Sequence, residues 1–186
     1  MLNLYIIAGP KGAGQTTAAY SILPEILDVK EFVNADEIAR GISPFNVESV
    51  AIQAGKIMLQ RIEQLIDLKQ SFCIETTLTT KSYLKTIENA KQQGYHITLV
   101  YIWLSTVELA IERVNDRVAK GGHNIPKEII ERRYIKGMQN LPKFMEAAFD
   151  WYLLDNSKSF YKIVAKCVDN GKSIFDNETY LKLLTV

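Results

Sequence analysis

The sequence has little cysteine, little histidine and almost no excess of charge. Its 186 residues include two cysteines and two histidines, and the formal net charge is +1. Cys73 lies in an apolar run that is typical of a buried strand, and Cys167 is its only companion, so we expect no disulfide framework and a reducing compartment. With so few sulfur and imidazole ligands, no zinc site is indicated. The balanced charge excludes a general attraction to nucleic acid or to anionic membranes, so any anion site must be local.

Long hydrophobic runs are missing as well. No apolar run approaches the ~20 residues needed to span a bilayer, and Met1 leads directly into an apolar segment without a signal peptide. We find no internal repeat and no low-complexity linker. The sequence therefore predicts one domain over residues 1–186, a cytoplasmic location, and neither nucleic acid nor membrane as a partner. Its 47% of hydrophobic residues are sufficient for a substantial core.

Short apolar segments alternate with amphipathic ones along the chain. Strands are expected at residues 2–8, 31–34, 71–74, 96–104 and 151–154, with a hairpin over 161–168 and 172–175. Helices are expected from about residue 16 to near 23, and over 47–66, 81–93, 108–119, 127–149 and 179–184. We expect a loop over 41–45, a helix cap at Asn46 and a break or kink at Pro142.

This alternation predicts an α/β fold with three layers, in which helices flank a mostly parallel sheet. Ligands of such sheets bind at the carboxyl ends of the strands. Three of the predicted strands end in chemically distinctive segments, namely residues 9–16, 34–36 and 75–77. We expect these segments to meet in one site.

The first strand is followed by a glycine-rich segment, Gly9–Thr16, and then by a predicted helix. The segment fits the phosphate-loop pattern G-x-x-x-x-G-K-[ST] at every fixed position except one, because Gln15 replaces the lysine. A loop of this kind directs backbone N–H groups and a helix N-terminus at phosphate, and Thr16 offers a hydroxyl to Mg²⁺. The alternative is a turn that only links a strand to a helix. The predicted nucleotide-binding residues of the loop are Gly9, Lys11, Gly12, Ala13, Gly14, Gln15, Thr16 and Thr17.

Gln15 leaves three interpretations open, which we rank in the following order. The chain is an inactivated variant, natural or engineered; it is a natural protein that binds nucleotide with weak turnover; or Lys11 supplies the missing charge from within the loop. Loss of one preorganised electrostatic contact typically costs roughly 10²–10³ in rate. Glutamine can still donate a hydrogen bond, so Gln15 is kept among the candidate catalytic residues.

Carboxylates follow two of the predicted strands. Asp36 is placed to accept the proton of a substrate hydroxyl that attacks a γ-phosphate, or else it caps the helical turn 37–39. Glu75 is placed to hold Mg²⁺ directly or through water, or else it caps the following helix. Thr76 is expected to be a local cap or a group near the substrate.

Basic residues gather after the fourth predicted strand, on two helices joined by a glycine-rich loop. Such a pair of helices could form a closing lid over about residues 113–135. Arg117 and Arg133 are candidates to stabilise the charge of phosphoryl transfer, and Arg113 could stack on the base or reach phosphate. His123, in the loop itself, either touches substrate or makes only local hydrogen bonds. The alternative is that these arginines lie on solvent-exposed helix surfaces and have no role in the site.

Taken in order, these motifs resemble the zeta-toxin-like family of small P-loop kinases, over about Asn3 to Asp155. The segments that carry the resemblance are Gly9–Thr17, Asn34–Ala39, Gly41–Pro44, Glu75–Leu78, Gly121–Pro126 and Arg132–Tyr134. The resemblance implies a P-loop NTPase fold of the nucleotide-kinase type with a helical lid. It also implies Mg²⁺-dependent transfer of phosphate from ATP or GTP to a small hydroxyl substrate. Zeta toxins phosphorylate UDP-N-acetylglucosamine and are held inactive by a partner antitoxin.

By this similarity Asp36 would be the base, Glu75 would serve the metal or the substrate, and the arginines of the lid would serve the phosphates. The family has lysine at position 15. The replacement of this lysine by Gln15 therefore bears on the activity of the chain and not on its fold. Three hypotheses follow. The chain is a kinase with activity reduced by Gln15, a nucleotide-binding protein without transfer, or a toxin-type module that acts through a partner antitoxin.

Overall fold

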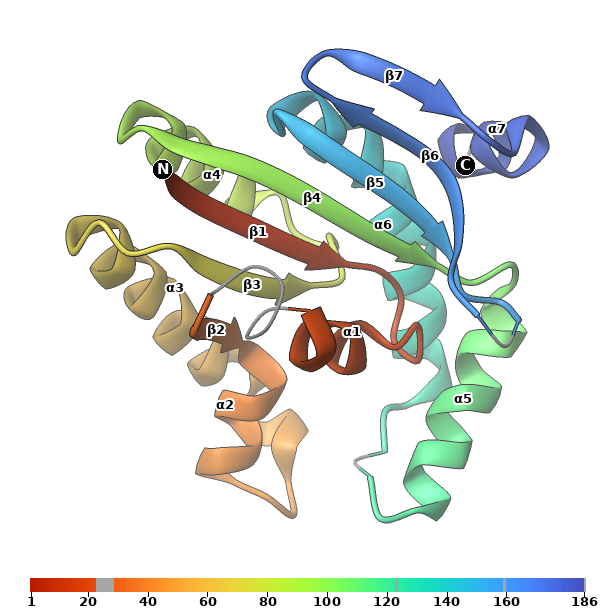
Figure 1. Ribbon diagram of the computed structural model, residues 1–186. Coiled ribbons are helices and arrows are strands. Elements are labelled where there is room, and N and C mark those ends of the chain that lie inside the picture. Colours follow the sequence, from red (N-terminus) through yellow and green to blue (C-terminus); the bar gives the residue numbers. More distant parts are fainter. Residues whose placement is uncertain (23–28, 123, 159, 186) are drawn as a thin grey trace.

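The computed structural model describes residues 1–22, 29–122, 124–158 and 160–185 (Figure 1). Within these residues, seven strands form one sheet in the order β2-β3-β1-β4-β5-β6-β7. The strands are β1 (Leu2–Ala8), β2 (Glu31–Asn34), β3 (Phe72–Thr76), β4 (Tyr95–Trp103), β5 (Asp150–Asp155), β6 (Lys162–Val168) and β7 (Gly171–Ile174). The first five strands of the chain pair in parallel with one another, and β6 pairs antiparallel with both β5 and β7. The predicted mostly parallel sheet is confirmed.

Helices lie on both sides of this sheet; in Figure 1, α1 lies toward the viewer, below the end of β1, and α4 and α6 lie behind the sheet. The helices are α1 (Gln15–Ile22), α2 (Ala35–Ile42), α3 (Ala51–Asp67), α4 (Ser82–Gln92), α5 (Val107–Ala119), α6 (Lys127–Ala147) and α7 (Asn177–Leu184), with a 3₁₀ turn η1 (Val47–Val50). The central strands are buried on both faces, which explains their nearly continuous apolar sequences. The expected end of the first helix near residue 23 lies outside the described residues.

The segment after β2 differs from its prediction. Residues 35–42 form the helix α2, although a loop was expected from residue 41. Asn34 caps this helix, because its side-chain oxygen accepts a hydrogen bond from the backbone N–H of Asp36 at 2.8 Å. Asp36 therefore lies in the first turn and is not the cap, so its carboxylate is available for other contacts.

Two further predictions about helices are wrong. Asn46 makes no side-chain capping bond, and residues 47–50 form η1 before α3 begins at Ala51. The helix does not break at Pro142, because α6 continues through this residue to Ala147. Proline has no backbone N–H to donate within the helix. The helix tolerates this loss because Asn140 and Phe144, on either side of the proline, are buried. Within the described residues, no helix is both long and apolar enough to cross a membrane.

Candidate active site

The glycine-rich loop lies between the end of β1 and the start of α1, as the sequence predicted. A side chain at Gly9 would overlap the carbonyl oxygen of Ile102 in the neighbouring strand. Gly14 has φ +86°, a conformation that residues with a Cβ rarely adopt. The loop therefore requires glycine at both positions, and it delivers the chain directly into α1 at Gln15.

Gln15 is used to fix the loop to the next strand. Its side chain is only 4% exposed, and its Nε2 donates a hydrogen bond of 2.9 Å to the carbonyl oxygen of Thr76 at the end of β3. The backbone N–H of Gly9 donates to the same oxygen at 3.3 Å. The side-chain amide of Gln15 thus links the start of α1 to the end of β3, and it brings no positive charge to the site.

Thr16 and Glu75 meet, as expected for residues of one metal site. The hydroxyl of Thr16 donates to Oε2 of Glu75 at 2.7 Å. The same oxygen accepts a hydrogen bond of 2.9 Å from Nδ2 of Asn34, which is buried at the end of β2. Asn34 thereby orients Glu75 with its amide nitrogen and caps α2 with its oxygen. Its place at a strand end was the signal for this role, but its contacts were not predictable from the sequence.

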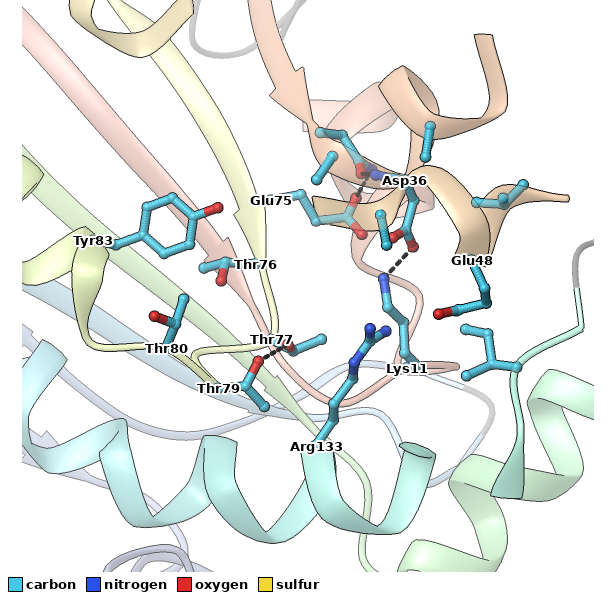
Figure 2. Close-up of a pocket in the computed structure, with 16 residues that line it drawn as sticks. Lys11, Asp36, Glu48, Glu75, Thr76, Thr77, Thr79, Thr80, Tyr83 and Arg133 are labelled. Carbon is cyan, nitrogen blue, oxygen red and sulfur yellow. Dashed lines mark hydrogen bonds and ion pairs between the residues drawn. The ribbon is translucent and has the colours of Figure 1, made fainter. Parts of the chain in front are cut away.

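Lys11 reaches out of the loop to the neighbouring strand end. Its Nζ forms an ion pair with the carboxylate of Asp36, and Figure 2 shows this pair in the middle of the site. The side chain of Lys11 is 10% exposed and that of Asp36 is 38% exposed. The pair is therefore buried on the lysine side and open to solvent on the carboxylate side.

The two carboxylates have pKa values shifted in opposite directions. Burial by itself would raise the pKa of Asp36, but the charge and hydrogen bond of Lys11, with more distant guanidinium groups, hold that pKa below its ordinary value. Burial raises the pKa of Glu75, and Lys11 and the Thr16 hydroxyl offset only part of the effect. Asp36 is therefore the stronger acid and is ionised at neutral pH.

Two cavities meet at these charged groups. One, of about 190 Å³, is lined by the glycine-rich loop together with Arg113 and Arg117. The other, of about 250 Å³, extends away from the loop between α2 and the segment after β3. Both are lined by Lys11, Asn34, Asp36 and Glu75. The site thus joins a loop-side compartment to a second compartment across an acid–base pair.

The second cavity has a wall of hydroxyl groups opposite its carboxylates (Figure 2). Besides Thr76, these come from Thr77, Thr79, Thr80 and Tyr83. Arg133 extends from α6 toward Lys11 and Asp36 in the same view. Such a lining offers hydrogen-bond partners to a polar molecule with several hydroxyl groups. Thr77 belongs to the segment 75–77 that was expected at the site. Thr79, Thr80 and Tyr83 were missed, since the sequence gives no sign of which way these side chains face.

Most of the predicted site residues are brought together. Gly12, Gly14, Gln15, Thr16 and Thr17 line the loop-side cavity with Arg113 and Arg117, and Thr76 and Arg133 line the second cavity. Gly9 and Ala13 line neither; Ala13 is buried and its N–H donates to the carbonyl of Pro10 at 3.1 Å. His123 lies outside the described residues.

Oxygen ligands for a metal ion are available but few. Within the described part of the chain, no group of three or more His, Cys, Asp and Glu side chains is arranged to hold a metal by itself. Thr16 and Glu75 offer a hydroxyl and a carboxylate within 2.7 Å of one another. Mg²⁺ in phosphoryl-transfer sites typically takes one or two protein ligands and completes its shell with water and phosphate oxygens. The residues present fit that mode of binding.

Comparison with known proteins agrees with this architecture. Residues 3–165 match the family model described as Zeta toxin. An uncharacterized protein of Haemophilus influenzae is 30% identical over 126 residues, which cover 68% of this chain and 88% of that protein.

Solved structures share the fold at low identity. The AvrRxo1-ORF1:-ORF2 complex with ATP superposes with a TM-score of 0.81 at 16% identity, covering 99% of this chain and 64% of that chain. The chain therefore spans less than two thirds of that relative's length. A structure of the PezAT chromosomal toxin-antitoxin system of Streptococcus pneumoniae has a TM-score of 0.64 at 18% identity, covering 89% and 72%. Shikimate kinase from Acinetobacter baumannii, in complex with shikimate, has a TM-score of 0.52 at 19% identity, covering 86% of each chain. The fold is that of P-loop kinases.

Proposed function

Because this chain belongs to the zeta toxin family, we propose that it is a P-loop kinase that transfers the γ-phosphate of ATP or GTP to a small hydroxyl compound. The observation that carries the proposal is the position of Asp36, an ionised carboxylate at the junction of two cavities. The donor's phosphates would lie on the loop side and the acceptor in the second cavity. Phosphoryl transfer requires this arrangement, since the two substrates must meet in line at the γ-phosphate.

The reaction follows from these positions. Asp36 accepts the proton of the acceptor hydroxyl while the hydroxyl oxygen forms a bond to the γ-phosphorus. The bond from that phosphorus to the bridging oxygen breaks, and its electron pair leaves with the nucleoside diphosphate. In the free protein Lys11 holds the pKa of Asp36 below its ordinary value, against the opposing effect of burial, so Asp36 is ionised before the substrates bind.

Thr16 and Glu75 are the proposed ligands of Mg²⁺, with Asn34 orienting the carboxylate. When bound, the ion neutralises charge on the β- and γ-phosphate oxygens. The backbone of residues 9–17 would cradle the phosphates, as the N-terminus of α1 favours anions. Glu75 also faces the second cavity, so it is placed to contact the acceptor as well.

The arginines of α5 and α6 are proposed to surround the transferred phosphate. Arg113 and Arg117 line the loop side and Arg133 the acceptor side. Guanidinium groups in such positions can contribute roughly 10³–10⁵ in rate. A closing movement of about residues 113–135 would bring them together. His123 remains a proposed substrate contact of this lid.

The acceptor is proposed to be a polyhydroxy compound, with a nucleotide sugar such as UDP-N-acetylglucosamine as the first candidate by family. Thr76 and the neighbouring hydroxyl groups of the second cavity support this choice, because they match hydroxyl groups with donors and acceptors. Gln15 contributes no charge, so its effect on the rate depends on whether another cation reaches the γ-phosphate.

The test is the substitution Asp36→Asn, with Asp67→Asn as its matched control. Asp67 is an exposed acid at the end of α3 and lines neither cavity. Transfer of labelled γ-phosphate to a panel of sugars, nucleosides and nucleotide sugars is measured with Mg²⁺. Asp36→Asn is expected to lower transfer about 10²–10⁴-fold, the range of general-base effects, while Asp67→Asn changes it little. Unchanged transfer by Asp36→Asn would refute the assigned base.

A second candidate function is favoured by Gln15 alone. A loop without the lysine charge suits a protein that binds nucleotide as a ligand or switch without transferring phosphate. Phosphorylated product formed well above the background rate would eliminate this alternative. Nucleotide binding that persists without any product across the panel would favour it.

A partner antitoxin is a further proposal, since solved relatives include toxin–antitoxin and two-protein complexes. The chain would then act as a toxin whose site is blocked in the complex. Expression of the chain alone is expected to slow bacterial growth, and co-expression with a small neighbouring gene is expected to restore it. A gene without such a neighbour would count against this proposal.

A further inference from the structure

We infer that Lys11 takes over the role of the missing P-loop lysine, and that the donor's γ-phosphate releases Asp36 by drawing Lys11 away from it. The inference rests on the proposed kinase function and assigns the cation and the activation step of that site. It makes the Lys11–Asp36 ion pair a resting state of the site.

Gln15 is unsuited to the lysine's role for two reasons. It is neutral, and its amide N–H already donates to the carbonyl oxygen of Thr76. That bond lies in the buried junction between the loop and β3. Turning Gln15 toward a phosphate would leave this carbonyl with only the 3.3 Å bond from Gly9. Position 15 therefore has a structural task, and the charge must come from elsewhere.

Lys11 is the cation that lies at the right place. It belongs to the loop itself, and among the described residues it is the one cationic side chain that lines both cavities. Arg113 and Arg117 line only the loop side, and Arg133 lines only the acceptor side. A γ-phosphate in transfer must sit between the two cavities. The Nζ of Lys11 is therefore positioned to follow it from donor to acceptor.

The ion pair gives this placement a consequence for the reaction. In the free protein Lys11 and Asp36 neutralise one another. A γ-phosphate carries more negative charge than a carboxylate and offers three oxygens, so it competes for the ammonium. Once Lys11 moves to the phosphate, Asp36 loses its partner and can accept the acceptor's proton. A nucleoside diphosphate has no γ-phosphate and leaves the pair intact, so the base stays blocked when transfer is impossible.

The experiment compares binding of AMP-PNP, a non-hydrolysable ATP analogue, with binding of ADP. Both are titrated calorimetrically with Mg²⁺ into the full chain, and thermal unfolding confirms that each variant is folded. The variants are Lys11→Gln, Lys11→Arg, Gln15→Lys and the exchange Lys11→Gln with Gln15→Lys. Lys85→Gln is the charge-matched control, since Lys85 is exposed on α4 away from the site.

Lys11→Gln is expected to weaken AMP-PNP binding about 10- to 100-fold, the scale of a hydrogen bond to a charged group, and to change ADP binding much less. Lys11→Arg and the exchange variant are expected to recover most of the AMP-PNP affinity, and Lys85→Gln to resemble the native chain. Gln15→Lys with Lys11 intact should gain only a few-fold, because the charge is already present.

Three results would overturn the inference. They are equal losses for AMP-PNP and ADP in Lys11→Gln, no loss for either, or a gain near 100-fold in Gln15→Lys, which would mean that the native site lacks the cation. A native chain that binds neither nucleotide would instead refute the proposed function itself. The two failures are therefore distinguishable.

Discussion

Among single residues, the ion pair of Lys11 and Asp36 is the centre of the proposed mechanism. Burial and Lys11 act on the pKa of Asp36 in opposite directions, and Lys11 prevails. If Lys11 were removed, burial would remain and would raise that pKa. The ionised fraction of the base at mildly acidic pH would fall with it. In the proposed mechanism, the pair thus connects one lysine of the loop to the pH range of phosphoryl transfer.

This connection predicts the acid limb of the pH–rate profile. The pH dependence of kcat/KM for ATP reports the pKa values of the free enzyme. For the native chain, the midpoint of the fall in kcat/KM at acidic pH should therefore lie below the ordinary Asp pKa of about 3.9. Lys11→Gln should move the limb to higher pH, and Lys11→Arg should leave it near the native position. The measurement is the rate of γ-phosphate transfer, or of ATP hydrolysis, across acidic pH. A limb that stays in place in Lys11→Gln would contradict the assignment of Asp36 as the base governed by Lys11.

The sequence predicted which residues meet here better than how they meet. The motif placed Thr16 and Glu75 in one site, and they are in contact. The interpretation in which Lys11 supplies the missing charge was placed third of three, because a sequence pattern does not give the direction of a side chain. The contact of Gln15 with Thr76 is likewise a tertiary one, 61 residues apart in the chain, and no local signal reveals it.

Among the elements, α6 is pressed closely against the segment that follows β3. A Cβ at Gly137 would overlap the carbonyl oxygen of Thr77. Three residues further on, Nδ2 of Asn140 donates to the carbonyl of Leu78 at 2.7 Å. These contacts hold in position the segment after β3, which carries the threonine hydroxyl groups of the second cavity. The glycine serves close approach, although a glycine inside a helix normally costs stability.

Two glycine-to-alanine substitutions should therefore have opposite effects. Gly55 is in α3 with open space around its Cα, so Gly55→Ala should stabilise the protein by about 0.5–1 kcal/mol through helix propensity. Gly137→Ala should destabilise it by about 1–3 kcal/mol through overpacking. Urea unfolding monitored by circular dichroism measures both. Stabilisation by Gly137→Ala would show that α6 does not need this contact.

Element positions were predicted well where one periodicity dominates. The limits of β1 and β2 were given correctly. Gly9 ends the apolar run of β1, and the polar residues Glu31 and Asn34 flank the apolar pair of β2. A break at Pro142 is absent because tertiary packing on both sides of the proline outweighs its local preference. The cap expected at Asn46 failed because a 3₁₀ turn precedes α3.

In the whole molecule, two residues from late in the chain contact the glycine-rich loop near its start. Nδ2 of Asn156 donates to the carbonyl of Ala13 at 2.9 Å, and the hydroxyl of Tyr161 donates to the carbonyl of Gly14 at 3.2 Å. Asn156 and Tyr161, which lie between β5 and β6, thereby contact the glycine-rich loop. The parallel sheet was predictable from the alternation of elements. The order of the strands and the contacts of Asn156 and Tyr161 with the loop were not predictable, because hydrophobic periodicity does not identify neighbours that are distant in the chain.

Equilibrium dialysis of the native chain against labelled ATP tests most directly whether the strand ends form a nucleotide site. It is done once with Mg²⁺ and once with the metal chelated. We predict one ATP bound per chain and a loss of affinity without Mg²⁺, because Thr16 and Glu75 are placed to hold the ion beside the phosphates. No ATP retained at about 1 mM, the upper end of ordinary KM values, would contradict the assignment of this chain as a P-loop kinase.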